Sequence, residues 1–240
     1  TQTGITCESF RTILANLRTN HDLSTLVVDK NNLNTPYSFT PISAIIATGN
    51  TLRVLSCAHC NLTDSFGAQF AEALKTNRGL VKFNFYGNEL TCRTLSLLAV
   101  ALKDSGGSLV EMNMGKNNLK DKGGERLGEA LRFNRSMKKI NLCDNNLTDE
   151  TALAINRNLL YSKMVEEINL SKNLINLRVL EMVQSTVAKI RETKVKAELP
   201  NQIKARQEFR HDRENYRKTE VEMEDSKQTR MKIEKQISKM

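Results

Sequence analysis

One eleven-residue pattern recurs six times in this 240-residue sequence and constrains its fold more than any other feature. The pattern reads L-x-x-L-x-L-x-x-N-x-L, where L stands for an apolar residue and the ninth position holds Asn in five copies and Cys in one. The copies begin at residues 23, 52, 80, 109, 137 and 165, so successive starts lie 28 or 29 residues apart. Such regular spacing is typical of a protein built from stacked, equivalent units.

Each unit predicts a short strand followed by a helix. The apolar fourth and sixth positions alternate with their neighbours, as in a strand with one buried face. The ninth-position Asn is expected to satisfy backbone groups where the chain turns out of the strand. Beyond the turn, apolar residues recur at helical spacing. These expected core positions are Phe66, Phe70, Ala73 and Leu74; Leu95, Leu98 and Leu102; Leu127, Ala130 and Leu131; and Leu153, Ile155 and Leu159.

Polar residues mark where the helices are expected to begin and end. Two Thr-Asp pairs, Thr63-Asp64 and Thr148-Asp149, can accept hydrogen bonds from the free amides of a first helical turn. Asn residues precede the next copy of the pattern by two or three positions, where they can end a helix in the left-handed conformation. The Asn residues expected to do so are Asn20, Asn50, Asn77 and Asn134.

A single strand and helix cannot bury their own apolar face, so the units must stack. The six copies resemble leucine-rich repeats of the ribonuclease-inhibitor type, a resemblance that covers about residues 5 to 176. It implies an α/β solenoid with a parallel inner sheet and outer helices. Residues 5–20 resemble the helical half of a preceding repeat, so we expect the solenoid of residues 1–176 to be truncated at its N-terminal end.

The remaining chain is expected to be helical and increasingly charged. Residues 177–199 keep enough apolar positions to cap the solenoid, and residues 200–240 are expected to form a basic tail. Two interpretations of this tail are equally supported. It is either an amphiphilic helix that packs against a partner, or a solvated helix or disordered segment. Its expected contact stripe, spaced in multiples of seven with Arg230 in the missing place, is Phe209, Tyr216, Met223 and Ile237.

Composition excludes other classes of protein. The longest uncharged apolar stretch is far shorter than the roughly 20 residues that span a bilayer, so no transmembrane helix is expected. The net charge of +9 is compatible with an acidic partner surface. The five cysteines lie inside apolar patterns, which predicts reduced thiols and a cytoplasmic location. They are Cys7, Cys57, Cys60, Cys92 and Cys143.

Neither a metal site nor an active site is predicted. Residues 57–60 (Cys-Ala-His-Cys) resemble half of a zinc site, but Cys57 and Cys60 occupy repeat positions that point inward, and no second pair of ligands accompanies them. We therefore expect buried structural thiols, no metal and no cofactor. No glycine-rich nucleotide-binding motif occurs, and no histidine has a partner in a recognisable catalytic motif, so the chain is expected not to be an enzyme. The histidines are His21, His59 and His211.

The inner face of the sheet is the candidate binding surface. The fifth repeat positions form a mostly polar ladder, which consists of Val27, Ser56, Asn84, Asn113, Asn141 and Asn169. Its side-chain amides either stabilise one another across neighbouring strands or bind a partner. Seventh positions are mostly small and leave room for a guest, with Tyr86 as an aromatic anchor. The candidate partner-binding residues are Arg53, His59, Lys82, Tyr86, Lys116 and Lys139, with Lys138 in the same basic cluster. Acidic residues are expected further along, and this mixed charge favours a protein, or the chain's own tail, over nucleic acid. These are Glu111, Asp144, Glu166 and Glu167.

The predicted function is that of a non-catalytic scaffold for protein interactions. A solenoid followed by a long helix resembles leucine-rich subunits of ciliary axonemes, including one in the nexin-dynein regulatory complex. This resemblance implies a cytoskeletal or axonemal assembly, and an acidic filament such as a microtubule or actin as partner. Tropomodulin-like actin cappers and regulators of enzymes, such as GTPase activators, are the alternatives. The tail is longer than in the cappers, and it is basic where activators of the GTPase Ran carry an acidic stretch.

Overall fold

The computed structural model describes residues 12, 22–48, 51–104, 108–197 and 200. The chain divides into two compact units, residues 1–191 and 192–240, and the sheet with its covering helices belongs to the first unit. The expected half-repeat at residues 5–20, the helix ends at Asn20 and Asn50, and the tail beyond Pro200 lie outside the described residues.

Six short parallel strands form one sheet in chain order, β1-β2-β3-β4-β5-β6. The strands are β1 (Thr25–Val27), β2 (Val54–Ser56), β3 (Lys82–Asn84), β4 (Glu111–Asn113), β5 (Lys139–Asn141) and β6 (Glu167–Asn169). Their register pairs the same repeat position in every neighbour, for example Leu26 with Leu55 and Leu55 with Phe83. The sheet is therefore built as the sequence pattern predicts.

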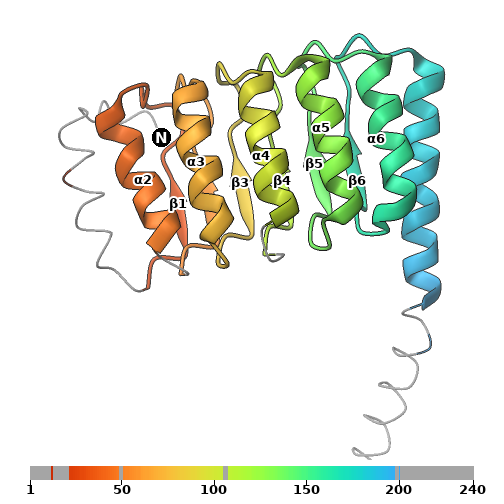
Figure 1. Ribbon diagram of the computed structural model, residues 1–240, viewed down its shortest axis with the longest axis horizontal. Coiled ribbons are helices and arrows are strands. Elements are labelled where there is room, and N and C mark those ends of the chain that lie inside the picture. Colours follow the sequence, from red (N-terminus) through yellow and green to blue (C-terminus); the bar gives the residue numbers. More distant parts are fainter. Residues whose placement is uncertain (1–11, 13–21, 49–50, 105–107, 198–199, 201–240) are drawn as a thin grey trace, which may run out of the picture. The chain divides into compact units, whose positions relative to one another are not determined.

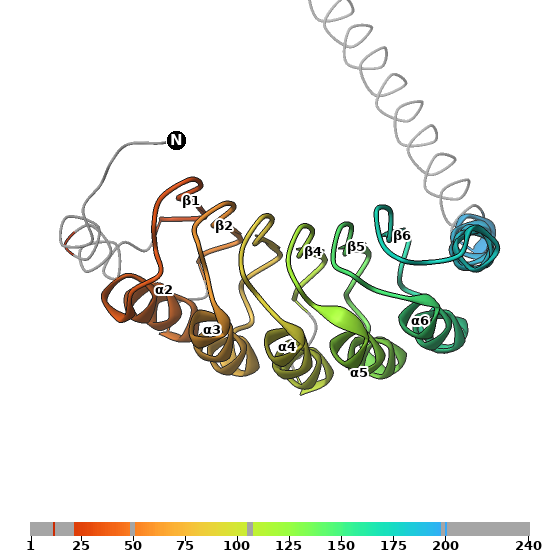
Figure 2. The same ribbon diagram turned by 90° about the horizontal axis from the view of Figure 1, so that it is seen from above.

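Helices cover one face of this sheet. Between β1 and β6 the structure describes α2 (Pro36–Thr48), α3 (Asp64–Thr76), α4 (Cys92–Asp104), α5 (Lys120–Phe133) and α6 (Asp149–Ser162). From α2 to α6, each helix contacts its neighbour in the series (Figure 1). In Figure 2 the helices line the outside of an arc and the strands its inside. This arrangement is a leucine-rich-repeat-type α/β solenoid, as expected.

A continuous apolar core fills the space between strands and helices. The side chains at the fourth and sixth repeat positions are buried in all six copies, which confirms the predicted strand pattern. The helical core positions are also buried, with one exception. Leu153 is 40% exposed, whereas Ile155 and Leu159 are fully buried. Residues two apart lie about 200° around a helix axis, so Leu153 cannot face the sheet together with Ile155.

The ninth-position Asn side chains connect adjacent repeats. Nδ2 of Asn88 donates to the carbonyl oxygens of Cys57 (3.0 Å) and Phe85 (2.9 Å). Its Oδ1 accepts from the amides of Cys60 (2.9 Å) and Leu62 (3.0 Å). Four backbone groups that the turn leaves without a strand partner are thereby satisfied by one buried side chain. The predicted role of this Asn is confirmed.

The expected left-handed helix ends are wrong at the two described positions. Asn77 (φ −70°, ψ 136°) and Asn134 (φ −67°, ψ 136°) are extended. Their buried side chains act instead: Oδ1 of Asn77 accepts from the amides of Gly79 (3.0 Å) and Leu80 (2.7 Å). Its Nδ2 donates to the carbonyl oxygen of Ile46 at the end of the preceding helix, 2.6 Å away. The backbone is extended at these positions because the chain leaves the helix there and continues toward the next strand.

Aspartates at the helix starts also connect repeats rather than cap their own helices. Thr63 makes no side-chain capping bond, which contradicts the prediction, whereas Thr148 does accept from the amide of Glu150 (3.3 Å). Asp64 accepts from the amide of Thr91 (2.9 Å) and from the hydroxyls of Thr91 and Thr94 in the next repeat. Asp121 accepts in the same way from a second Thr pair, Thr148 and Thr151.

The pKa values of these two aspartates predict that the fold loses stability in acid. Burial alone would raise the pKa of Asp64 and Asp121, but the Thr hydrogen bonds outweigh it and hold each pKa below the ordinary value. A lowered folded-state pKa stabilises the fold above the unfolded-state value of about 4, and this contribution disappears as the pH falls through the folded-state pKa. Urea denaturation followed by circular dichroism should therefore show a smaller decline below about pH 4 in the Asp64→Asn, Asp121→Asn double variant. An acid decline as steep as that of the unchanged chain would contradict this role.

The helix that follows β6 spans residues 177–197. Val183, Val187 and Ile190 are buried in the same core cluster as the strands. Nε2 of Gln184 donates to the carbonyl oxygen of Ile168 in β6 (3.0 Å). These residues cover apolar side chains of the last repeat. None of the described helices is both long and apolar enough to cross a membrane.

Candidate protein-binding surface

The inner face of the sheet carries an alternating row of charges at the third repeat position. Lys82, Glu111, Lys139 and Glu167 are register neighbours on β3 to β6. Nζ of Lys82 lies 2.7 Å from Oε2 of Glu111, and Nζ of Lys139 lies 3.2 Å from Oε2 of Glu167. Exposed pairs of this kind add little to stability but define a charge pattern that a partner can recognise.

The basic cluster expected around Tyr86 is therefore neutralised only in part. Lys138 also pairs with an acidic residue, Glu166, at 3.7 Å. The guanidinium of Arg53 donates to the carbonyl oxygen of Gly79 (2.8 Å). The sequence predicted basic residues on one side and acidic residues further along, but the sheet register interleaves them. Lys116 lies in the exposed loop after β4, in the left-handed conformation (φ 52°).

The Asn ladder at the fifth position follows a different bonding scheme from the one predicted. Oδ1 of each Asn accepts from the backbone amide two residues ahead, at 3.0 to 3.2 Å. Nδ2 of Asn84 donates to the hydroxyl of Ser56 (3.1 Å). Within the described residues, the Nδ2 groups of Asn113, Asn141 and Asn169 donate no hydrogen bond. The ladder thus presents amide donors to the inner face, over a shallow pocket on β4 to β6.

Tyr86 and His59 form an aromatic pair at the end of the strands. Their ring centroids lie 5.4 Å apart at an interplanar angle of 70°. The amide of His59 donates to the carbonyl oxygen of Tyr86 (2.8 Å). Two glycines make room for the rings: a Cβ on Gly115 would lie 2.9 Å from the Tyr86 ring, and one on Gly87 would lie 2.4 Å from the His59 ring. Tyr86 is half-buried and His59 exposed, so one edge of the pair remains accessible.

The two thiols near His59 belong to the apolar core. Cys57 and Cys60 are fully buried, as predicted. Burial raises the pKa of Cys57 well above its ordinary value, and it raises the pKa of Cys60 to about 11. The Cys60 thiol donates to the carbonyl oxygen of Val28, with Sγ and oxygen 3.2 Å apart. A raised pKa favours the protonated thiol, which is a weaker nucleophile than the thiolate.

The structure brings together only part of the predicted site. Tyr86 and His59 are in contact, and Lys82 and Lys139 lie on the same sheet face. The tail stripe Phe209, Tyr216, Met223 and Ile237 lies outside the described residues. In the part of the chain that the structure describes, no three His, Cys, Asp or Glu side chains gather as metal ligands would.

Sequence reasoning missed an aromatic and cationic surface on the outer helices. There Arg132 lies over the ring of Tyr161, with 4.6 Å between the guanidinium carbon and the ring centroid. Lys103 lies over the ring of Phe133 at 5.0 Å. A signal was present, because Phe133 and Tyr161 break the polar outer faces of their helices at equivalent places in successive repeats.

Comparison with known proteins finds structures with a similar fold but no relative that is similar in sequence. No protein-family model and no curated protein matches this sequence. A solved structure titled "Leiomodin-1 Actin-Binding Site 2" is similar at 14% identity with a TM-score of 0.59, over 82% of this chain and 97% of the other. The C-terminal domain of tropomodulin from Caenorhabditis elegans is similar at 14% identity with a TM-score of 0.50, over 82% and 99%. Together with the six-stranded parallel sheet, these similarities show that the chain has a leucine-rich-repeat-type fold.

Proposed function

We propose that this chain is a non-catalytic scaffold that binds another protein on its inner sheet. The observation that carries this proposal is the accessible Tyr86–His59 pair beside a ladder of unused amide donors. A half-buried aromatic residue supplies contact area, and amide donors supply specificity, as in other protein interfaces. The alternating charges on β3 to β6 suit a partner with charges of both signs.

Actin is the partner that we propose to test first. The leiomodin-1 structure, which shares this fold, is titled as an actin-binding site. That likeness supports a cytoskeletal role for the present chain and agrees with the tropomodulin-like interpretation of its sequence. We propose that the chain acts within a cytoskeletal assembly, with monomeric or filamentous actin bound to the inner sheet.

An axonemal subunit of the ribonuclease-inhibitor repeat type is the second candidate. It is supported by the resemblance of the sequence to axonemal leucine-rich subunits and by the basic tail, in which residues 189–240 hold fifteen basic and ten acidic residues. The tail would then bind the acidic surface of a microtubule. Co-sedimentation with microtubules should weaken as salt rises, and it should be lost when residues 201–240 are deleted. Unchanged sedimentation after this deletion would contradict a role of the tail as the anchor.

Replacing Tyr86 by Ala should weaken the binding of actin by about tenfold or more, equivalent to roughly 1 to 3 kcal/mol. The reason is that Tyr86 supplies a large aromatic ring to the inner surface. Its removal would lose the contact with His59 and the proposed contact with actin. Fluorescence anisotropy with labelled monomeric actin, and co-sedimentation with filaments, would measure the change.

Tyr161→Ala is the matched control for this experiment, since Tyr161 is an exposed tyrosine on the opposite, helical face. It should leave the affinity for actin unchanged. A loss of affinity in Tyr161→Ala but not in Tyr86→Ala would move the site to the outer helices. If neither form of actin nor microtubules bind to the unchanged chain, the cytoskeletal assignment is wrong.

A further inference from the structure

We infer that the outer face of the solenoid carries a second binding surface, which takes an acidic protein segment with a large apolar side chain. This surface lies on the helices, away from the inner sheet, and so goes beyond the proposed function. We call it the convex patch and define it by Val100 and Lys103 of α4, Arg132 and Phe133 of α5, and Tyr161 of α6.

A pocket of about 370 Å³ lies within the convex patch. Its lining includes the buried side chains of Ala99 and Ala130 and the exposed ones of Val100 and Phe133. Small residues at the base and larger residues around them leave a hollow between adjacent helices. Such a hollow accepts a single apolar side chain from a partner, as pockets at interface hot spots do.

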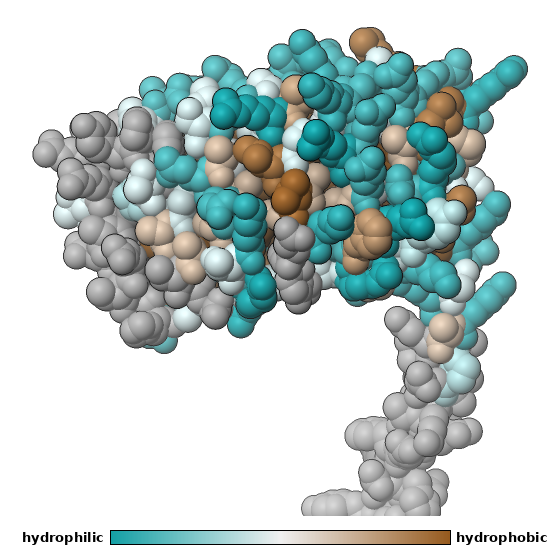
Figure 3. All heavy atoms as spheres, viewed as in Figure 1, coloured by the Kyte–Doolittle hydropathy of each residue, from teal (hydrophilic) through white to brown (hydrophobic). Residues whose placement is uncertain are grey.

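The apolar side chains of the convex patch are exposed. Val100 is 44%, Phe133 is 52% and Tyr161 is 59% accessible to solvent. Figure 3, which views the helix-covered face, shows apolar residues surrounded by hydrophilic ones. Apolar surface that is contiguous and rimmed by polar residues marks an interaction site more often than scattered single residues do.

The cations of the convex patch are positioned but not neutralised. Lys103 lies over the Phe133 ring at 5.0 Å, and Arg132 lies over the Tyr161 ring at 4.6 Å. Among the described residues, neither they nor Arg126, which also lines the pocket, forms an ion pair. A guanidinium that stacks on a ring still has its in-plane N–H groups available, and these match a carboxylate.

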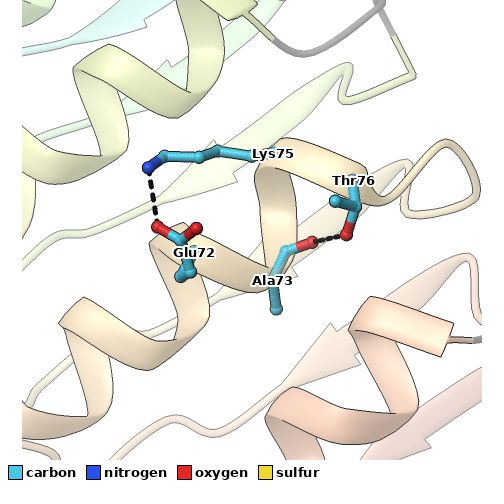
Figure 4. A network of polar contacts seen from close by, with 4 residues as sticks. All are labelled: Glu72, Ala73, Lys75 and Thr76. Atoms are coloured by element: carbon cyan, nitrogen blue, oxygen red, sulfur yellow. Dashed lines mark hydrogen bonds and ion pairs between the residues drawn. The ribbon is translucent and has the colours of Figure 1, made fainter.

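Four lysines elsewhere in the described chain are ion-paired. On the outer face of α3, Nζ of Lys75 lies 2.6 Å from Oε2 of Glu72. Figure 4 shows the two side chains of this ion pair pointing toward each other. On the inner side of the solenoid, three lysines pair with glutamates of the next repeat. The convex patch differs from these sites, because its cations lie beside exposed apolar surface and have no carboxylate partner within the described residues.

This combination commits the surface to an acidic protein segment. Three cations and one carboxylate, that of Glu129, line the pocket, so its charge is positive. The chain's own tail is a poor occupant because it is basic. A nucleic acid fits this surface poorly, because the carboxylate of Glu129 would repel its phosphates. Its phosphate backbone would also leave the apolar hollow empty. A peptide with Asp or Glu next to Phe, Leu or Trp uses both features.

Selection from a random 12-residue peptide library displayed on phage tests this inference. The full chain serves as bait, and the Arg132→Glu variant serves for counter-selection. We expect the enriched peptides to combine acidic residues with a large apolar residue. Their affinity, measured by fluorescence anisotropy, should fall by about tenfold or more in Arg132→Glu and in Phe133→Ser. Replacing the acidic residues of an enriched peptide by Lys should restore part of its binding to Arg132→Glu.

Two controls separate this surface from the inner sheet and from misfolding. Tyr86→Ala should bind the enriched peptides as the unchanged chain does, so a failure here and a failure of the proposed function are distinguishable. Phe133 and Arg132 are exposed, so both variants should keep the thermal midpoint of the unchanged chain. The inference is overturned if no peptide is enriched over Arg132→Glu, if the enriched peptides lack acidic residues, or if DNA or anionic vesicles displace them from the patch.

Discussion

Replacing Phe85 by Ala is expected to lower the free energy of unfolding by about 4 kcal/mol. Phe85 is fully buried, and its ring centroid lies 5.2 Å from that of Phe66, 4.7 Å from that of Phe70 and 4.6 Å from that of Phe83. Truncation would remove contacts with three rings from two elements and leave a cavity between β3 and α3. Urea denaturation followed by circular dichroism measures the change, since the chain has no tryptophan.

Phe133→Ala provides the matched control, because it removes the same side chain from a site that is 52% exposed. We expect a loss below about 1 kcal/mol there. Equal losses in the two variants would show that this cluster of phenylalanine rings is not the centre of the core. Each repeat contacts only its neighbours, so Phe85→Ala is also expected to broaden the transition by uncoupling the units on either side.

Replacing Asn88 by Ala is expected to cost about 3 kcal/mol, nearly as much as losing a buried phenylalanine. The buried amides of Cys60 and Leu62 would lose their acceptor, and the carbonyl oxygens of Cys57 and Phe85 their donor. Each buried polar group left without a partner costs roughly 1 to 3 kcal/mol, and partial access of water reduces the total. The same urea denaturation measures this loss.

Two further substitutions make this prediction sharper. Asn118→Ala, at an exposed position, should change stability by less than about 0.5 kcal/mol. Asn88→Cys should lie between the unchanged chain and Asn88→Ala. Cys60, the natural Cys at a ninth position, donates to Val28 and Ala58, while the amide of Leu33 bonds to its main-chain oxygen. Cys can thus replace the donor of Asn but not its acceptor. A stability of Asn88→Cys equal to that of Asn88→Ala would refute this.

The strands and the core were predictable because they depend on local periodicity. Leu55 and Phe83 are buried since side chains alternate along a strand, whatever the neighbours are. The helix ends were not predictable in the same way. Asn77 and Asp64 each make a bond to a residue about 30 positions away in sequence, in an adjacent repeat. Propensity describes how a residue caps its own helix, and stacking offered these side chains other partners.

The candidate surfaces show the same division. The frame position of Tyr86 predicted that it lies on the inner face, but its contact with His59 depends on the glycines of neighbouring repeats. The lysines were predicted as a basic cluster, yet Lys82 and Lys139 are paired with glutamates because the parallel register brings equal repeat positions side by side. The convex patch was not predicted, since a helical pattern identifies the buried face and says little about the exposed one.

The sequence by itself determined the repeat, the alternation of strand and helix, and which side chains enter the core. Each of these depends on spacing along one segment of chain, and apolar side chains must leave water whatever their neighbours are. Only the tertiary structure decided which charges are neutralised, which amides remain free, and where aromatic rings and cations meet. Those properties depend on distances between repeats, and such distances exist only after the units have stacked in a single register.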